Sequence, residues 1–285
     1  MNLGLLVSGE LGFEMLKQVS ASYKVKFVMT DSNSESIRNY CNDNQIDCFS
    51  GNPRNGKAIK FLGSPVVDVL LSVNYLFLVE KDILSIPKII AINIHGSLLP
   101  KYRGRTPHVW SIINNESNAG ITAHVIDEGC DTGAILEQIV VPILENDTGY
   151  SLLLKYKNLY GALVDSVLRK VDVNTLCFHH QDDSKSTYFS KRTPDDGHIN
   201  WSWHKERIRN WVRAQAFPYP GAFTFYRGQK VIIDKIEYCD SGFKFDMPDG
   251  LIISENPVLV KTPNGVVVLE EIRNKIEMKR GELLK

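Results

Sequence analysis

The chain has 285 residues, 43% of them hydrophobic and 23% charged, which is typical of a globular protein in water. Lys plus Arg equal Asp plus Glu at 33 each, and this zero net charge argues against nucleic-acid binding, which usually needs a basic excess. Five cysteines without a Cys-x-x-Cys spacing exclude a disulfide framework and fit a reducing, cytoplasmic setting. The N-terminus lacks the pattern of a signal peptide, and no apolar run approaches the ~18 residues of a membrane span, so we expect no membrane partner.

The first part of the chain alternates apolar strands with helices. Strands are expected over residues 3–7, 23–29 and 66–73, and helices over 13–20, 33–44 and 80–85. Ser32 is the expected N-cap of the second helix, because Glu35 three residues later completes a capping box. The glycines near the first turn do not form a dinucleotide fingerprint. The turn at Ser8 and Gly9 still presents backbone N–H groups at a helix start, which favours an anion site.

A polar stretch follows the most apolar part of the sequence. Residues 89–92 form a branched apolar run, typical of a buried parallel strand, and lead directly into Asn93 and His95. Side chains two apart share a face of a strand, so we expect Asn93 and His95 to point the same way, at the end of the sheet where ligands bind. A second strand over 120–126 runs into a loop with two glycines, which allow Asp131 to return toward His95.

An amide, an imidazole and a carboxylate suit acyl transfer. The imidazole can move a proton, the carboxylate can hold it in one tautomer, and the amide can donate to a developing oxyanion. On spacing alone, ordinary polar residues near strand ends remain the favoured interpretation. Cys130 could be a nucleophile but is better explained as a small loop residue. Cys177 with His179 and His180 lacks a second ligand cluster, so no metal is expected.

The remaining pattern predicts two domains. Helices are expected over 106–114, 147–170 and 205–214, a strand over 134–143, and short strands separated by turns from Ala222 onward. Asn264-Gly265 between apolar runs predicts a hairpin. The fold class is therefore α/β. A Rossmann-like, mostly parallel sheet occupies an N-terminal domain, residues 1–190, and a smaller β-barrel-like (OB-like) domain occupies residues 191–285. Such barrels can bind nucleic acid, but the basic excess of this half is too mild to support it.

Residues 93–104, 120–124 and 127–133 together resemble the signature of the formyltetrahydrofolate-dependent formyltransferases. The resemblance implies that Asn93, His95 and Asp131 are the catalytic residues. It also implies that N10-formyltetrahydrofolate is the co-substrate, with no metal.

The second half resembles one branch of that family. Residues 191–201 and 212–223 are similar to the sugar-nucleotide N-formyltransferases. These include the enzymes acting on dTDP-4-amino-4,6-dideoxyhexoses and on UDP-4-amino-4-deoxy-L-arabinose. The resemblance implies a nucleotide-linked amino sugar as acceptor, with dTDP-4-amino-4,6-dideoxyglucose first, for surface polysaccharide (O-antigen) biosynthesis. Methionyl-tRNA formyltransferase is the alternative, disfavoured because the segment after the second strand is short and not basic. A non-catalytic folate- or nucleotide-binding module is an alternative of another class.

The resemblance also suggests binding residues. The predicted folate contacts are Tyr75, Leu76, Phe77, Asp127, Gly129 and Cys130. Leu76 and Phe77 could equally cap the core. The predicted sugar-nucleotide contacts are Ser8, Gly9, Lys101, Arg103, Arg105, Arg192 and Trp201. The arginines match phosphate oxygens but could equally lie in a solvated basic loop, and Trp201 stacks on the base unless it serves packing. We expect a homodimer, because the apolar hairpins of the second domain can supply a dimer face.

Overall fold

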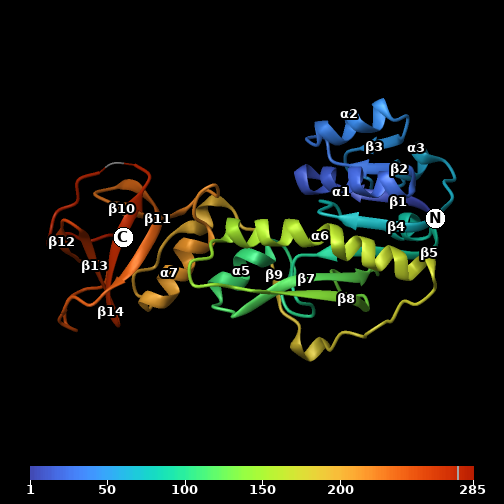
Figure 1. Cartoon of the computed structure of the whole chain (residues 1–285). Helices are drawn as coiled ribbons and strands as arrows, with labels where there is room; N and C mark the ends of the chain where they lie inside the picture. Colours follow the sequence, from blue (N-terminus) through green and yellow to red (C-terminus); the bar gives the residue numbers. More distant parts are fainter. Residues whose placement is uncertain (275) are drawn as a thin grey trace. The chain divides into compact units, whose positions relative to one another are not determined.

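The computed structural model describes residues 1–274 and 276–285 (Figure 1). The helices are α1 (Gly9–Ser22), α2 (Glu35–Asp43), α3 (Lys57–Leu62), α4 (Lys81–Leu84), α5 (Pro107–Ile113), α6 (Gly149–Asp172) and α7 (Lys205–Ala214), with 3-10 turns η1 (Asp183–Lys185) and η2 (Pro194–Gly197). The strands are β1 (Asn2–Val7), β2 (Lys24–Thr30), β3 (Asp47–Ser50), β4 (Val67–Val73), β5 (Pro87–His95), β6 (Arg103–Gly104), β7 (Asn118–Val125), β8 (Ile135–Pro142), β9 (Tyr188–Phe189), β10 (Ala222–Tyr226), β11 (Gln229–Cys239), β12 (Ile252–Glu255), β13 (Val258–Thr262) and β14 (Gly265–Ile272).

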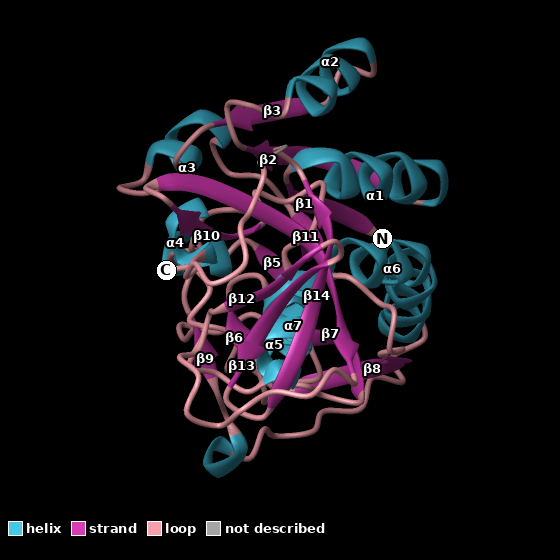
Figure 2. Ribbon diagram, turned by 90° about the vertical axis from the view of Figure 1, so that its left-hand side faces the viewer, coloured by secondary structure: helices cyan, strands magenta, loops and turns pink. Residues whose placement is uncertain are grey.

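The first sheet has seven strands in the order β3-β2-β1-β4-β5-β7-β8. The pairs β2/β3, β1/β2, β1/β4 and β4/β5 are parallel, and helices connect these strands, as in a Rossmann-like fold (Figure 2). The pair β5/β7 is antiparallel. The predicted α/β class with a mostly parallel sheet is thus confirmed.

Helices cover both faces of this sheet. Ala58 of α3 and Ile83 of α4 pack with Leu6 and Leu70 in one buried cluster on one face. On α1, Glu14 forms an ion pair with Lys157 of α6 at 2.8 Å, and Gln18 donates to the carboxylate of Asp165 at 3.0 Å, so these two helices lie together. Burial of both faces explains why β1 and β4 read as nearly continuous apolar runs.

The second sheet has five strands in the order β10-β11-β14-β13-β12, all paired antiparallel. This confirms the predicted smaller β-rich part. The predicted hairpin joins β13 to β14, but Thr262 pairs with Gly265, so the two connecting residues are Pro263 and Asn264 rather than Asn264 and Gly265.

Two compact units emerge from the packing, and each is discontinuous in sequence. The first comprises Met1–Gly104, Gly120–Val141 and Tyr156–Tyr188, and the second comprises Arg105–Ala119, Pro142–Lys155 and Phe189–Lys285. The division of the chain into domains at residue 190 stays a prediction. None of the helices among the described residues is both long and apolar enough to span a membrane.

The start of α2 corrects the sequence analysis. The N-cap is Ser34 and not Ser32, and it makes no side-chain capping bond. Its hydroxyl instead donates to the carboxylate of Asp31 at 2.6 Å and accepts the N–H of Gly9 at 2.8 Å. The capping box at Ser32 is absent because Ser32 lies in a turn ahead of the helix, where the carboxylate of Asp31 accepts the N–H of Asn33 at 2.8 Å. Strand β3 and helix α3 were not predicted at all.

Candidate active site

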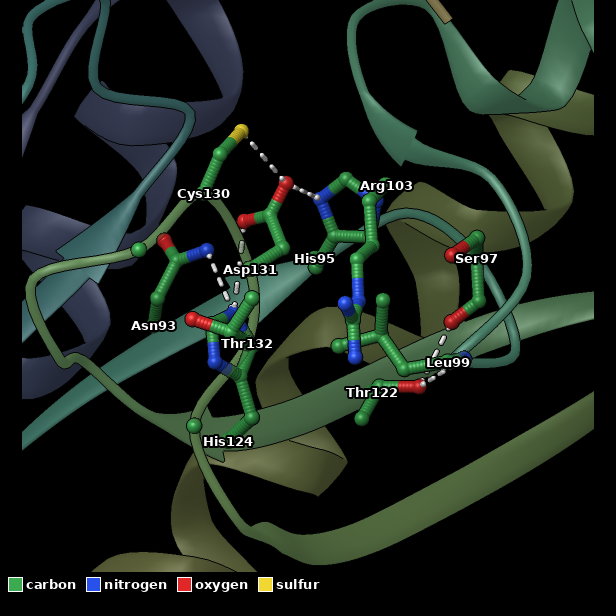
Figure 3. Close-up of polar contacts among 12 residues, drawn as sticks. Asn93, His95, Ser97, Leu99, Arg103, Thr122, His124, Cys130, Asp131 and Thr132 are labelled. Atoms are coloured by element: carbon green, nitrogen blue, oxygen red, sulfur yellow. Dashed lines mark hydrogen bonds and ion pairs between the residues drawn. The ribbon is translucent and has the colours of Figure 1, made fainter. Parts of the chain in front are cut away.

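Strand β5 ends at the centre of the first unit and carries two polar side chains on one face. Asn93 is half-buried and His95 is buried, and both point toward the loop after β7 (Figure 3). The alternation of the strand places them on the same face, as predicted. Below them, the hydroxyl of Thr122 donates to the carbonyl of Ser97 at 2.6 Å, which holds the turn after β5 against β7.

Both ring nitrogens of His95 face acceptors. Nε2 lies 2.8 Å from the carbonyl oxygen of Tyr102 and therefore carries a proton. Nδ1 lies 3.6 Å from Oδ2 of Asp131. Burial lowers the pKa of His95 and outweighs Asp131, which acts to raise it. His95 is therefore neutral at neutral pH, with Nδ1 unprotonated and open to receive a proton.

Asp131 reaches His95 from a loop and not from a strand end. Because β7 runs antiparallel to β5, its last residue, Val125, pairs with Ile92, ahead of Asn93. The loop 127–133 therefore makes the return to His95 that its two glycines were expected to allow. Asp131 itself adopts the left-handed region at φ 56°. A methyl group at Gly133 would collide with the carbonyl of Val125, so this glycine serves close approach of the backbone.

Asp131 is ionised in this setting. Its Oδ2 accepts the backbone N–H of Gly104 at 2.9 Å, and its Oδ1 lies 3.5 Å from Nε2 of His124. Burial acts to raise the pKa of Asp131. The neighbouring imidazoles and the N–H of Gly104 outweigh that burial and hold the pKa well below its usual range. A fixed negative charge therefore stands beside the neutral ring of His95.

His124 is a member of the cluster that the sequence analysis did not select. It is 2% exposed and pairs with Asn93 across β5 and β7. Its Nε2 lies 3.1 Å from the amide nitrogen of Asn93, and its Nδ1 lies 2.8 Å from the carbonyl of Val125. The antiparallel register of β5 and β7 brings His124 beside Asn93, and this register cannot be read from the sequence.

The cluster has the parts of a proton-transfer and oxyanion site. Asn93 supplies amide N–H groups, His95 supplies an unprotonated nitrogen, and Asp131 supplies a charge that stabilises an imidazolium. Among residues 1–274 and 276–285, no three His, Cys, Asp or Glu side chains gather closely enough to hold a metal ion.

Known protein families match both parts of this chain. The formyl transferase family matches residues 6–167, and the C-terminal domain of formyl transferases matches residues 191–285. The chain belongs to the formyl transferase family. The predicted one-carbon transferase family is thereby confirmed.

Two curated relatives are about a third identical to this formyl transferase over the aligned residues. The bifunctional polymyxin resistance protein ArnA of Wigglesworthia glossinidia brevipalpis is 34% identical over 90% of this chain, which spans only 39% of that protein. The methionyl-tRNA formyltransferase of Caldanaerobacter subterraneus is 34% identical over 83% of this chain and 75% of its own length.

Solved structures share the fold at lower identity. The N-formyltransferase of Helicobacter canadensis, in complex with folinic acid and dTDP-3-aminofucose, has a TM-score of 0.70 at 22% identity, over 94% of this chain and 98% of that one. A 4-N formyltransferase of Francisella tularensis has a TM-score of 0.69 at 21% identity, over 81% and 96% respectively.

The predicted folate contacts lie in two loops of the first unit. Leu76 is 42% exposed, while Phe77 is half-buried and meets Tyr75 edge to face at 5.5 Å between ring centres. In the other loop, Asp127 accepts the N–H of Gly129 at 3.1 Å. Exposed Cys130 directs its sulfur at Asp131 Oδ2, 3.6 Å away (Figure 3). The folate roles of these residues stay a prediction.

Ser8 and Gly9 lie at the start of α1. Ser8 is buried and its carbonyl accepts the side-chain amide of Asn74 at 2.9 Å. Gly9 has φ 64°, and its N–H donates to Ser34 at 2.8 Å. One of the N–H groups expected to bind an anion is therefore already engaged.

Arg103 corrects the sequence analysis. Its guanidinium is buried, with two nitrogens donating to Oε1 of Gln181 and further bonds to Asp183 at 2.7 Å and to the hydroxyl of Tyr188 at 2.5 Å. The side-chain amide of Gln181 in turn donates to the carbonyls of Asp131 and Gly133. Arg103 therefore supports the Asp131 loop and is not placed to bind a pyrophosphate. Lys101 and Arg105, on either side of it, are exposed.

Two of the predicted contacts in the second unit, Arg192 and Trp201, pack against other side chains. The guanidinium of Arg192 lies between the indoles of Trp110 and Trp211, 4.9 and 4.4 Å from their ring centres. Trp201 is 4% exposed and its indole N–H donates to Thr224 at 2.9 Å. The ring of Trp201 thus serves packing, the alternative that the sequence left open, and not stacking on a base.

Proposed function

We propose that this formyl transferase moves the formyl group of N10-formyltetrahydrofolate to the amine of a nucleotide-linked amino sugar, in the cytoplasm. The observation that carries the transfer chemistry is the neutral imidazole of His95 beside the ionised carboxylate of Asp131. The sugar acceptor is supported by the named ligands of the structural relatives, which are a folate and a dTDP-amino sugar.

Each residue of the cluster has a role in this proposal. The folate supplies an electrophilic formyl carbon. Asn93 donates an N–H to the formyl oxygen as negative charge develops there. The amine attacks the formyl carbon, His95 takes its proton on Nδ1, and Asp131 stabilises the imidazolium that results. The imidazolium then returns that proton to N10 as the C–N10 bond breaks, which releases tetrahydrofolate and restores the neutral ring. Lowering of the His95 pKa by burial keeps this base unprotonated before the reaction.

The remaining contacts to the two substrates come from the loop after β4 and from the segment after β5. Exposed Leu76 and half-buried Phe77 offer an apolar surface that suits the flat ring system of a folate. Exposed Lys101 and Arg105 follow β5 closely and provide positive charge for a pyrophosphate. We propose dTDP-4-amino-4,6-dideoxyglucose as the first acceptor to test, for surface polysaccharide synthesis, and a homodimer as the working assembly.

The test is an assay with N10-formyltetrahydrofolate and a panel of acceptors. The panel contains dTDP-4-amino-4,6-dideoxyglucose, a dTDP-3-amino sugar, UDP-4-amino-4-deoxy-L-arabinose and methionyl-tRNA, with products identified by mass spectrometry. Formylation of an amino-sugar nucleotide, abolished in His95→Ala, supports the proposal. Formylation of methionyl-tRNA alone overturns it, and the 34% identity to a methionyl-tRNA formyltransferase is the observation that favours that second candidate.

A further inference from the structure

His124 has a fixed tautomer. Its Nδ1 lies 2.8 Å from the carbonyl oxygen of Val125, which can only accept, so Nδ1 carries the proton. Its Nε2 lies 3.1 Å from Nδ2 of Asn93, which can only donate, so Nε2 is unprotonated. The ring is 2% exposed and held by the strand that carries it.

The tautomer of His124 and the orientation of the Asn93 amide are coupled through this contact. An unprotonated Nε2 accepts from the amide nitrogen and repels the amide oxygen. The nitrogen of Asn93 is therefore drawn toward His124, and its second N–H stays available on the face that His95 shares (Figure 3). With the amide reversed, the oxygen would face the unprotonated Nε2, and the developing charge on a formyl oxygen would lose its donor.

Asp131 is the more distant of the two groups that face Nε2. Its Oδ1 lies 3.5 Å from that nitrogen, while Nδ2 of Asn93 lies 3.1 Å away. A proton on Nε2 would be donated to Asp131 instead, so the tautomer decides which of the two is bonded. The pairing of Asn93 with His124 in the register of β5 and β7 makes this contact part of the sheet.

We propose that His124 is a positioning residue for formyl transfer, which orients the amide of Asn93 so that its nitrogen serves the oxyanion. This inference rests on the proposed function, because it assigns Asn93 the task of stabilising charge. His124 makes no contact with the reacting atoms in this role; it acts through Asn93.

Two substitutions separate the two ring nitrogens. In His124→Gln, the terminal oxygen takes about the position of Nε2 and can accept from Asn93. In His124→Asn, the side-chain nitrogen takes about the position of Nδ1 and can still donate to Val125, but Asn93 loses its acceptor. Each variant therefore keeps one of the two contacts of His124. If His124 had only a structural role, activity would not depend on which of the two contacts is kept.

The expected results follow from the loss of one aligned donor. His124→Asn should lower kcat by about 10²-fold with little change in KM for the acceptor, and His124→Gln should recover most of that loss. Asn93→Ala and the Asn93→Ala/His124→Asn double variant should have equal kcat, because no amide is left to orient. Wild-type turnover in His124→Asn, or losses that multiply in the double variant, would overturn the proposal. Equilibrium unfolding of each variant verifies that it folds.

A spectroscopic measurement is independent of activity. Nitrogen NMR of protein labelled at histidine reports which ring nitrogen of His124 carries the proton at neutral pH. A proton on Nδ1 alone is expected, and a proton on Nε2 overturns the inference even if no acceptor is ever formylated. Failure of all acceptors in the wild-type enzyme, with the expected tautomer present, would count against the proposed function and not against the geometry.

Discussion

The imidazole of His95 and the carboxylate of Asp131 lie 3.6 Å apart, Nδ1 to Oδ2, although they arrive from a strand end and from a returning loop. Burial keeps the ring neutral, while hydrogen bonds and nearby rings keep the acid ionised. The fixed negative charge favours proton uptake by the neutral ring, because the imidazolium that forms is paired with the carboxylate.

Replacement of Asp131 by asparagine tests this electrostatic role. Asparagine also adopts positive φ readily, so Asp131→Asn can keep the backbone conformation at φ 56°. We expect kcat to fall by about 10²-fold or more, with the KM for the acceptor little changed. Steady-state kinetics across pH measures both quantities.

The pH profile of Asp131→Asn should also move. Asp131 acts to raise the pKa of His95, so removal of its charge lowers that pKa further. The base is active when neutral, so activity should persist to lower pH than in the wild type. An acid limb that stays in place would show that Asp131 only shapes the loop.

Gly133 tests the path of that loop. A methyl group there would collide with the carbonyl of Val125, so Gly133→Ala should displace Asp131 from His95. A misplacement of about 1 Å can cost about 10²-fold in turnover. Gly242→Ala is the matched control, because a methyl group there has nothing within 4 Å. Equal activity of the two variants would contradict the close approach seen at Gly133.

The sequence predicted the elements of the site better than their connection. Apolar runs and period-two alternation identified β5 and placed Asn93 and His95 on one face, because both patterns reflect burial of a strand. The direction of β7 relative to β5 was not predictable in this way, since parallel and antiparallel buried strands have the same composition. His124 was missed for that reason alone.

The errors among the charged residues have a different cause. Arg103 lies in a basic segment with Lys101 and Arg105, and composition cannot tell which of the three is buried. Its partners Gln181 and Asp183 are distant in sequence and lie in an irregular segment without periodicity. Long-range side-chain networks of this kind leave no local signal.

Arg103→Lys should lower the free energy of unfolding without weakening the binding of the acceptor. Lysine keeps the charge, but its compact ammonium has three N–H donors and cannot reproduce the four hydrogen bonds that the guanidinium fork makes to Gln181, Asp183 and Tyr188. We therefore expect a loss of about 1–3 kcal/mol in the free energy of unfolding. Turnover should fall as the Asp131 loop loosens, with the acceptor KM nearly unchanged. Exposed Arg54→Lys is the control and should lie within about 0.5 kcal/mol of the wild type. A selective rise in KM would instead restore Arg103 as a pyrophosphate ligand.

His108 in α5 makes the stability of the second unit depend on pH. Its Nε2 lies 2.9 Å from the hydroxyl of Tyr219, and burial lowers the pKa of His108 to about 4. Burial raises the pKa of Tyr219 to about 12, so the phenol stays protonated and can donate to the neutral ring. The unfolded chain binds a proton at this histidine near about pH 6.5.

The sign of the effect follows from that difference. Above about pH 6.5 both states hold a neutral ring, and the folded state has its full stability. As the pH falls from about 6.5 to about 4, only the unfolded state gains the proton, so stability should decrease by about 3 kcal/mol in total. In His108→Gln, which can still bond to Tyr219 but cannot titrate, urea unfolding should show a flatter pH dependence by that amount. Exposed His180→Gln is the control and should follow the wild-type curve. If His108→Gln also follows that curve, His108 takes up its proton as readily in the folded protein as in the unfolded chain, and burial does not govern its charge.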